Sequence, residues 1–212
     1  GYGQTEVLMT VLNYPWMPVK PGSMGRPLPG IETGLLKPDG SLGGCGDQGE
    51  LLIRLPSPQM MLGYWNDTER TGQALFKSDD NQWFRTGDNV YQDDDGYFFY
   101  VGRTDDIINS AGYRIGPQEV ENALISHPAV QESAVVGVPD PERGEIVKAF
   151  VVLADPGLER GSNDLVSELQ DHVKQYTAPY KYPRSIEFVD ELPKTVSGKI
   201  RRIELREKEW SN

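Results

Sequence analysis

Four short segments of this 212-residue chain contain residue types that can bind sugars, phosphates and metal ions. They contribute carboxylates, hydroxyls, glycines and fixed positive charges. The segments are residues 2–6, residues 85–88, residues 102–106 with 112–114, and residues 193–199. Each segment alone is weak evidence, since polar loops, turns and solvated lysines have the same composition. Their order and spacing along the chain therefore carry more information than any one of them.

Two of the acidic or glycine-containing stretches resemble simpler sites but lack the required pattern. Residues 193–199 look like a phosphate-binding loop, yet Pro193 stands in place of the first glycine and Ile200 replaces the hydroxyl residue that would hold Mg²⁺. Residues 93–96 form an acidic run without the alternating ligand spacing of a Ca²⁺ loop. We therefore expect neither a P-loop NTPase nor a calcium site, and residues 93–96 are predicted to be a hairpin tip.

Composition and charge exclude further classes. The chain has 21 Lys+Arg against 32 Asp+Glu, and this net charge of -11 argues against a nucleic-acid or anionic-membrane binder. No apolar run approaches the roughly 18 residues that a membrane span needs. The single cysteine, Cys45, lies in a glycine-rich turn without an activating base. The two histidines, His127 and His172, are too few and too far apart to indicate a histidine metal site or a catalytic triad.

The sequence texture changes after about residue 103, from short strands between Pro/Gly turns to alternating helices and strands. Strands are predicted at residues 50–55, 97–101, 130–138, 146–153 and 185–189, with turns at 37–40 and 93–96. Helices are predicted at residues 117–125, from 163 or 164 to before 179, and at 203–210. The fold class is therefore α+β, with a β-rich domain of residues 1–103 and a small mixed α+β domain of residues 104–212.

In this order and spacing, the four segments resemble the late signature motifs of the adenylate-forming superfamily. That superfamily comprises acyl-CoA synthetases, luciferases and peptide-synthetase adenylation domains, and the similarity covers essentially the whole chain. Three further segments, residues 108–117, 138–145 and 177–184, look most like medium-chain acyl-CoA synthetases. The resemblance implies that residues 1–103 are the C-terminal part of a large ATP- and acid-binding domain, and that residues 104–212 are a small mobile C-terminal domain.

An acid–CoA ligase is the enzyme that this resemblance implies. Such an enzyme joins a carboxylic acid to ATP, giving an acyl-adenylate and pyrophosphate, and then transfers the acyl group to CoA with release of AMP. The implied partners are therefore a small-molecule, medium-chain carboxylic acid, ATP and CoA, with Mg²⁺ as the metal ion. No nucleic acid and no transmembrane segment are expected.

The resemblance also implies a set of nucleotide-binding residues. These residues are Tyr2, Gly3, Gln4, Thr5, Glu6, Asp88, Arg103 and Lys199. The carboxylate of Glu6 suits Mg²⁺ on the triphosphate, and the two oxygens of Asp88 suit a ribose diol. Tyr2 offers a flat ring for adenine, Thr5 a hydroxyl for the α-phosphate, and Arg103 a positive charge near ribose and phosphate.

Catalysis, domain rotation and CoA binding are assigned by the same resemblance. Lys199 is the implied catalytic residue, because a mobile cation offsets the repulsion between an anionic carboxylate and an anionic α-phosphate. Asp105 matches the hinge of the small domain, and Arg114 matches a residue that contacts the nucleotide phosphate or the substrate. The implied CoA-binding residues are Ala111, Gly112, Tyr113, Arg143, Lys174, Tyr182 and Arg184, with ordinary solvated side chains as the alternative for the last four.

We expect the chain to be a piece of a longer protein. It lacks the Ser/Thr/Gly-rich triphosphate loop, most of the acid pocket and the rest of the upstream N-terminal region, so it is predicted to be inactive alone. Two alternatives remain open: an adenylation module that loads a carrier protein, and a non-catalytic nucleotide- or CoA-binding remnant. The resemblance implies the mitochondrial matrix if the source is eukaryotic, and otherwise the cytoplasm.

Overall fold

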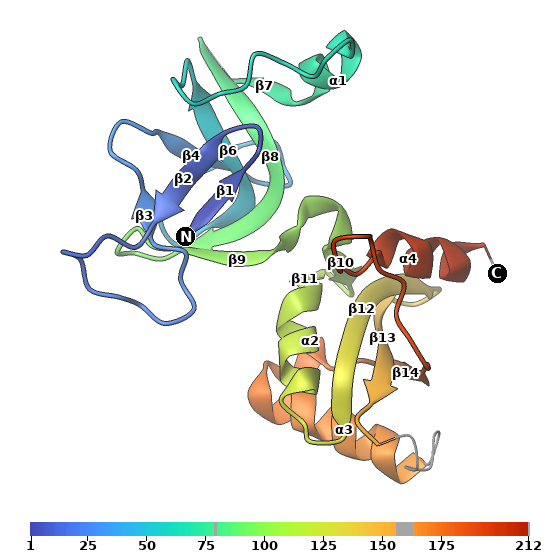
Figure 1. Cartoon of the computed structure of the whole chain (residues 1–212). Helices are drawn as coiled ribbons and strands as arrows, with labels where there is room; N and C mark the ends of the chain where they lie inside the picture. The colour runs from blue at the N-terminus through green and yellow to red at the C-terminus, as the bar shows by residue number, and fades with distance from the viewer. Residues whose placement is uncertain (79, 156–162, 212) are drawn as a thin grey trace. The chain divides into compact units, whose positions relative to one another are not determined.

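The computed structural model describes residues 1–78, 80–155 and 163–211. The chain folds into two compact units, Gly1–Asp105 (unit 1) and Asp106–Asn212 (unit 2) (Figure 1). The predicted domains meet two residues earlier, between residues 103 and 104. Within the described ranges, no helix is long and apolar enough to cross a membrane.

The regular elements of unit 1 are mostly β-strands, joined by long irregular segments. Its elements are β1 (Tyr2–Gln4), β2 (Leu8–Leu12), β3 (Arg26–Pro27), β4 (Thr33–Leu36), β5 (Leu42–Gly43), β6 (Gln48–Leu55), α1 (Thr68–Gln73), β7 (Leu75–Ser78), β8 (Asn81–Gln92), β9 (Phe98–Arg103) and the 3₁₀ turn η1 (Thr104–Asp106). A three-stranded sheet has the order β1-β2-β3. A six-stranded sheet has the order β5-β4-β6-β8-β7, with β9 also paired to β8.

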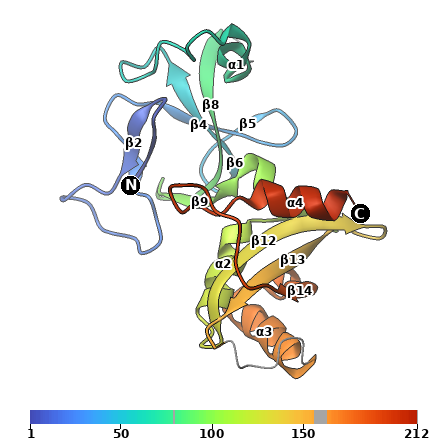
Figure 2. The same cartoon turned by 45° about the vertical axis from the view of Figure 1, so that its right-hand side comes forward.

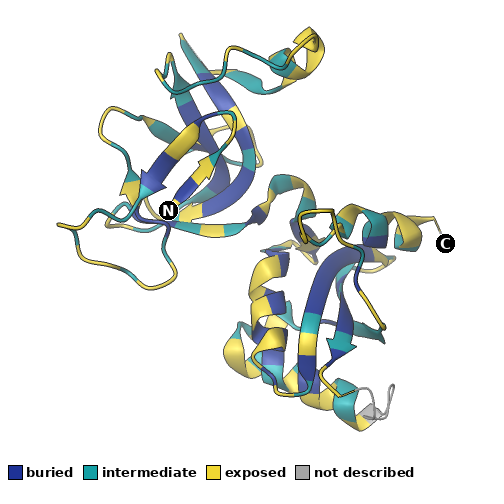
Figure 3. Cartoon of the chain, in the orientation of Figure 1, coloured by how far each residue is buried: buried dark blue, intermediate teal, exposed yellow. Residues whose placement is uncertain are grey.

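The core of unit 1 gathers apolar side chains from both sheets. Leu51 and Ile53 of β6 share one buried cluster with Val11 of β2, Leu35 of β4 and Phe84 of β8. Figure 3 shows long buried stretches on β8. The apolar run at the centre of β6 is explained by this position, because a strand covered on both faces cannot alternate apolar and polar residues.

Unit 2 is a mixed α+β structure. Its elements are β10 (Ile108–Ser110), β11 (Tyr113–Ile115), α2 (Pro117–Ile125), β12 (Val130–Asp140), β13 (Gly144–Leu153), α3 (Asn163–Tyr176), the 3₁₀ turn η2 (Pro179–Lys181), β14 (Ser185–Phe188) and α4 (Arg202–Trp210). The sheet has the order β11-β10-β13-β12, and β14 pairs with β13 in parallel. The predicted α+β fold class is confirmed.

Helices cover both faces of the sheet in unit 2. Successive residues of a strand point to opposite faces. Val135 of β12 therefore shares a buried cluster with Leu169 of α3 and with apolar residues of α2. Its neighbours Ala134 and Val136 belong to a second cluster with Leu205 of α4. Figures 1 and 2 show the corresponding layers, with α2 and α3 lying apart from α4.

Most predicted elements lie where the sequence places them, with ends shifted by one or two residues. The helix predicted at residues 117–125 has the same bounds as α2. The main difference is β8, a strand of 12 residues that the sequence does not predict. Its residues 86–88 have the composition of a turn, because Gly tolerates positive φ and Asp bonds to local backbone. In the structure these residues form a bulge inside the strand.

Candidate functional site

A bulge in β8 places Asp88 in a polar cluster of unit 1. The pairing of β6 with β8 loses its regular register between Glu50 and Leu52, opposite residues 86–88. Gly87 has a φ of 70°, a conformation that favours glycine. Bulges of this kind re-aim the following side chain. The side chain of Asp88 is accordingly 8% exposed and lies among polar groups from β1 and β9.

Four side chains donate hydrogen bonds to the carboxylate of Asp88. The hydroxyl of Tyr2 and Nε2 of Gln4 both donate to Oδ2, each at 2.6 Å. The hydroxyl of Tyr100 and Nη1 of Arg103 both donate to Oδ1, each at 3.3 Å. The donors come from β1 and β9, which lie about 100 residues apart in the sequence. Oδ2 is therefore held tightly, whereas Oδ1 has two long bonds that a better donor is able to replace.

The electrostatics of this cluster keep its donors protonated. Burial, together with the hydrogen bond and negative charge of Asp88, raises the pKa of the Tyr2 hydroxyl far above its usual value. Burial lowers the pKa of Arg103, but the carboxylates of Asp88 and Asp105 outweigh it and leave that pKa raised. Nε of Arg103 lies 3.5 Å from Oδ1 of Asp105. Tyr2 and Arg103 therefore remain donors throughout the neutral pH range.

The position of the Tyr2 ring differs from the expectation. A ring that stacks on adenine needs an open face, but Tyr2 is 9% exposed and belongs to the core cluster of unit 1. Only its hydroxyl reaches the polar cluster, through the bond to Asp88. In this structure Tyr2 orients the carboxylate and does not present a flat platform.

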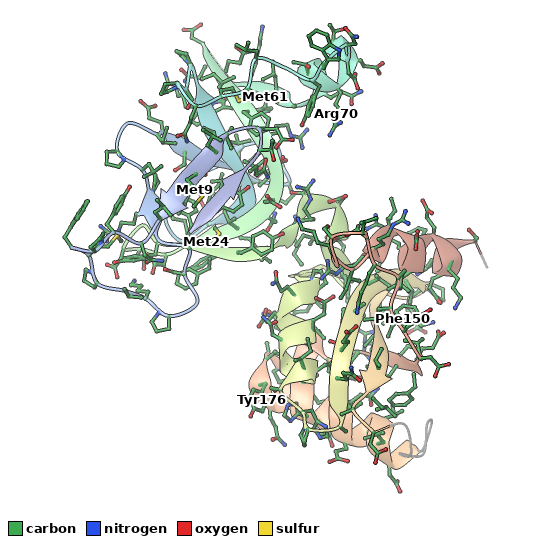
Figure 4. The ribbon with its side chains drawn as sticks, in the orientation of Figure 1. Met9, Met24, Met61, Arg70, Phe150 and Tyr176 are labelled. Carbon is green, nitrogen blue, oxygen red and sulfur yellow. The ribbon has the colours of Figure 1, made fainter. Side chains whose placement is uncertain are left out.

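Glu6 follows β1, and a residue outside the predicted site holds its carboxylate. The hydroxyl of Tyr64 donates to Oε1 of Glu6 at 2.9 Å, and the backbone N–H of Met61 donates to the Glu6 carbonyl at 2.8 Å. Cζ of Arg70, a residue labelled in Figure 4, lies 3.8 Å from the centroid of the Tyr64 ring. Among the residues that the structure describes, no three His, Cys, Asp or Glu side chains group to hold a metal ion. One carboxylate fits Mg²⁺ where substrate phosphates and water supply the other ligands.

Lys199 lies on a tight loop that leads into α4 in unit 2. The backbone N–H of Thr195 donates to the Lys199 carbonyl at 2.8 Å, and the Lys199 N–H donates to Oγ1 of Thr195 at 3.1 Å. Gly198 closes the turn with a φ of 82°. The side chain of Lys199 is exposed and has no ion-pair partner in the described part of the chain.

A buried ion pair fixes the far end of this loop. Glu121 of α2, with a side chain 6% exposed, accepts from Nε and Nη2 of Arg202 at 2.8 and 2.6 Å. The same carboxylate accepts from the backbone N–H of Val135 at 2.9 Å. One turn further along α4, Nη1 of Arg206 lies 3.3 Å from Oδ1 of Asp106. Arg202, three residues after Lys199, is thereby tied to α2 and β12.

The turn between β10 and β11 brings together three of the predicted CoA-binding residues. Ala111 and Gly112 form the turn with φ values of 50° and 84°. The Ala111 N–H donates to the carbonyl of Arg143 at 3.0 Å. A Cβ at Gly112 would meet no atom within 4 Å, so the backbone conformation, and not crowding, favours glycine there.

Aromatic rings and cations from three other predicted residues also meet in unit 2. The Tyr182 ring centroid lies 4.5 Å from Nζ of Lys174 and 5.0 Å from Cζ of Arg184. Tyr113, which is 52% exposed, stacks on Tyr180 with ring centroids 4.2 Å apart. Tyr180 precedes Tyr182 by two residues. Basic and aromatic groups are thus concentrated around η2, a composition that suits phosphates and flat rings.

Some predicted residues contribute differently or stand apart. Gly3 serves the packing of β1 on β2, because a Cβ there would lie 2.3 Å from the Leu8 carbonyl oxygen. Thr5 is exposed and, among the described residues, forms no hydrogen bond with the Asp88 cluster. Arg114 pairs with Asn109 across β10 and β11, and burial lowers the pKa of its guanidinium.

Several supporting residues are not predicted from the sequence. They are Glu50, Tyr64, Thr86, Tyr100, Glu121, Tyr180 and Arg202. Most of them act through partners far away in the chain, which only strand register brings close. Glu50 alone has a local signal, since a carboxylate at the start of the apolar run 51–53 indicates a buried charge with a partner.

Comparison with known proteins identifies two family regions. Residues 1–65 match the family described as AMP-binding enzyme, and residues 119–199 match the AMP-binding enzyme C-terminal domain. The chain is 49% identical over 214 residues to mouse acyl-coenzyme A synthetase ACSM3, mitochondrial, covering 99% of this chain and 36% of that protein. It therefore spans about a third of the length of the curated relatives that it matches.

Two solved structures are also similar to this chain over nearly its whole length. The chain matches the anthranilate CoA ligase AuaEII, solved with anthranoyl-AMP, with a TM-score of 0.82 and 40% identity, over 99% of this chain and 39% of that one. It matches ATP-bound MatB from Rhodopseudomonas palustris with a TM-score of 0.79 and 33% identity, over 98% of this chain and 39% of that one.

Proposed function

The chain belongs to the adenylate-forming superfamily, and from this premise we propose that it is part of an ATP-dependent, AMP-forming acid–CoA ligase. One observation carries the proposal. Three of the residues expected to bind the nucleotide, Tyr2, Gln4 and Arg103, donate to the carboxylate of a fourth, Asp88, although they come from distant strands.

The proposed reaction has two balanced steps. A carboxylate oxygen of the acid attacks the α-phosphorus of ATP, which gives the acyl-adenylate and releases pyrophosphate. The CoA sulfur then attacks the acyl carbon, which forms the thioester and releases AMP and the thiol proton. Unit 1 would be the C-terminal part of the large domain that binds ATP and the acid, and unit 2 would be the small mobile domain.

Asp88 would hold the ribose in this reaction. Its Oδ2 is fixed by Tyr2 and Gln4, whereas the two bonds to Oδ1 are long, so a ribose hydroxyl is able to take their place. Arg103, released from Oδ1, would keep a positive charge beside the phosphates. Thr5 would donate its exposed hydroxyl to the α-phosphate.

Glu6 would hold the magnesium ion of the nucleotide. Bound Mg²⁺ would neutralise charge on the triphosphate and so assist release of pyrophosphate. The bond from Tyr64 leaves Oε2 of Glu6 as the oxygen directed to the ion.

Lys199 would act in the first step and residues around η2 in the second. The exposed ammonium of Lys199 would stabilise the negative charge that gathers as carboxylate and α-phosphate join. Asp105, paired with Arg103, would be the hinge about which unit 2 rotates. Arg114 would contact the nucleotide phosphate or the substrate.

CoA would bind along the β10–β11 turn and the aromatic–basic group near η2. Gly112, which follows Ala111 in this turn, has no atom within 4 Å of its Cβ position, so the thiol-bearing arm of CoA would be able to pass close to the backbone there. Basic side chains beside aromatic rings suit the phosphates and the base of CoA. The residues proposed for this role are Ala111, Gly112, Tyr113, Arg143, Lys174, Tyr182 and Arg184.

We assign a medium-chain carboxylic acid as the substrate class, in line with the similarity to acyl-CoA synthetases such as mouse ACSM3. The mitochondrial matrix is the proposed compartment for a eukaryotic source, and the cytoplasm otherwise. This 212-residue chain alone is expected to be inactive, since it spans only 36% of the length of mouse ACSM3.

Formation of AMP by the full-length protein tests the proposal. Butyrate, octanoate and benzoate are each supplied with ATP and Mg²⁺, with and without CoA. We expect acid- and CoA-dependent release of AMP, and a loss of roughly 100-fold or more in kcat for Lys199→Ala, because removal of one preorganised charge-stabilising group has that effect.

Lys208→Ala is the matched control, since Lys208 lies on α4 with an exposed side chain paired to Glu187. Its kcat should stay within about twofold of the unmodified protein. Acid-dependent pyrophosphate exchange without any response to CoA would replace the ligase by an adenylation module for a carrier protein. Absence of AMP with every acid would leave only a nucleotide- or CoA-binding remnant.

A further inference from the structure

Glu50 is a buried carboxylate that has no part in the proposed chemistry. Its side chain is 5% exposed, and it lies at the point where β6 and β8 lose their register. Oε1 accepts from the backbone N–H of Gly87 at 2.9 Å. Oε2 accepts from Nη2 of Arg85 at 2.6 Å and from Nε at 3.1 Å. Both oxygens are therefore used. Oε1 binds the backbone of the bulge and also lies 3.3 Å from Nε of Arg85, whereas Oε2 binds Arg85.

Polar contacts from several strands stabilise the bulge. The Thr86 carbonyl accepts from Nε2 of Gln4 at 2.7 Å and from Nη1 of Arg103 at 3.1 Å, and the other contacts involve β6. Glu50 pairs with Asn89, and Leu52 pairs with Arg85, so residues 86–88 have only Leu51 opposite them. The backbone groups in this stretch cannot continue the regular ladder and need other partners.

Thr86 and Glu50 supply those partners. Oγ1 of Thr86 donates to the Leu51 carbonyl at 2.7 Å and accepts from the Asp88 N–H at 3.1 Å. The N–H of Gly87 is satisfied by Glu50. Loss of the Glu50 contact would leave a backbone donor unpaired immediately before Asp88, in a conformation that ordinary strand pairing does not stabilise.

We propose that Glu50 is a positioning residue for nucleotide binding: it clamps the β8 bulge so that the Asp88 carboxylate is held for the ribose. This inference rests on the proposed role of Asp88. A buried charge with one solvent-accessible partner costs desolvation energy and is weak evidence of stability alone. Its two-sided contact, with the Gly87 backbone and with Arg85, instead fits a geometric role. In a neutral amide one of the two terminal atoms is an NH2 group, which donates and does not accept. Glutamine therefore keeps an acceptor at only one of the two positions, the one that contacts Gly87 and Nε of Arg85 or the one that accepts the short bond from Nη2 of Arg85.

The experiment compares ATP with 2′-deoxy-ATP as substrates of the full-length protein, in the Glu50→Gln variant. Loss of a clamp that acts through Asp88 should raise KM for ATP roughly tenfold and should lower the preference for ATP over 2′-deoxy-ATP by roughly the same factor. At saturating ATP, kcat should change less than about twofold. A purely structural effect does not distinguish nucleotides that differ in one ribose hydroxyl.

Two further variants make the outcome decisive. Glu32→Gln removes a different Glu–Arg pair, the exposed contact between Glu32 and Arg54 of β6 at 3.1 Å. This variant should leave KM for ATP and the preference for ATP over 2′-deoxy-ATP unchanged. Asp88→Ala should abolish the preference for ATP. If Glu50→Gln keeps the full preference for ATP over 2′-deoxy-ATP while Asp88→Ala loses it, the inference about Glu50 is overturned and the ribose role of Asp88 stands. If Asp88→Ala keeps the preference, the proposed ribose role of Asp88 is itself overturned.

Thr86→Val covers the case in which Glu50→Gln does not fold. It removes the hydroxyl bridge from Leu51 to the Asp88 N–H without unpairing a charge. The clamp then predicts a smaller loss of the ATP preference, roughly threefold. A preference equal to that of the unmodified protein would overturn the inference.

Discussion

Asp88 illustrates how a carboxylate is prepared for a ligand at the scale of single residues. Short bonds from Tyr2 and Gln4 fix one oxygen, and long bonds from Tyr100 and Arg103 fill the other. A ligand that replaces the long bonds loses little of the existing hydrogen bonding, and the short bonds keep the carboxylate oriented. The arrangement depends on the backbone of Gly87, which carries the positive φ of the bulge.

Gly87→Ala should damage both the backbone and the site. The new Cβ requires a φ that L residues rarely adopt, which costs about 1–2 kcal/mol, and it would lie 2.6 Å from Nη2 of Arg103. We therefore expect a loss of stability and a rise in KM for ATP as Arg103 is displaced. Gly40→Ala is the matched control, because Gly40 has a φ of 83° and no atom within 4 Å of the Cβ position.

The two variants separate strain from displacement. Both should lower the free energy of unfolding by about the same amount, measured by urea denaturation, because they share the φ penalty. Only Gly87→Ala should raise KM for ATP. An equal KM for ATP in the two variants would show that a side chain at position 87 does not displace Arg103 from the site.

The sequence predicts some of the residues that meet at this site, but not all of them. Tyr2, Gln4, Asp88 and Arg103 belong to motifs whose order is visible in one dimension. Tyr100, Thr86 and Glu50 join them only through the register of β6, β8 and β9, which is broken by bulges. A shift of one residue reverses the face of every side chain in a strand, so such partners cannot be read without the structure.

At the scale of elements, helix α4 is the anchor of the Lys199 loop. Its first residue, Arg202, is held by Glu121 of α2, and apolar contacts of Leu205 fix the helix on the sheet. The helix α2 was predictable because Pro117 begins it and its apolar spacing is regular. The ion pair that joins it to α4 was not, because its residues are 81 positions apart.

Glu121→Ala should destabilise unit 2 and loosen the loop. Removing one partner of a buried pair costs about 3–5 kcal/mol, and the lower end applies because Arg202 is 23% exposed. The measurement is hydrogen exchange of the β12 amides, which reports opening of the sheet. Faster exchange of Val135 is expected in particular, since its N–H loses the Glu121 acceptor.

Glu119→Gln is the control for this prediction. Glu119 lies on the same helix and pairs with Lys181 at 2.6 Å, but its side chain is 46% exposed. An exposed pair contributes about 0–1 kcal/mol, so exchange in β12 should hardly change. Equal protection losses in the two variants would contradict the account of the Glu121 pair as the buried anchor.

At the scale of the whole molecule, each of the two units has its own buried apolar side chains, and the residues proposed for ATP and CoA chemistry are divided between the units. One buried cluster belongs to unit 1, and two clusters on opposite faces of the sheet belong to unit 2. The spacing of apolar residues made the helices of unit 2 and its strands β12, β13 and β14 predictable, whereas the short strands β10 and β11 are not among the predicted elements. The strands of unit 1 are shorter and more irregular, and its bulged strand β8 was missed because its central residues have the composition of a turn.

We propose that the full-length protein activates an acid as an acyl-adenylate. Transfer of an oxygen atom from the acid to AMP is the direct sign of this chemistry. An acid labelled with oxygen-18 in its carboxylate is converted in the presence of ATP, Mg²⁺ and CoA. The mass of the AMP product is then measured by mass spectrometry. The attacking carboxylate oxygen becomes the bridge between acyl carbon and phosphorus. It stays with phosphorus when CoA attacks the acyl carbon, so the account predicts AMP that carries one labelled oxygen. Unlabelled AMP formed together with acyl-CoA would contradict it.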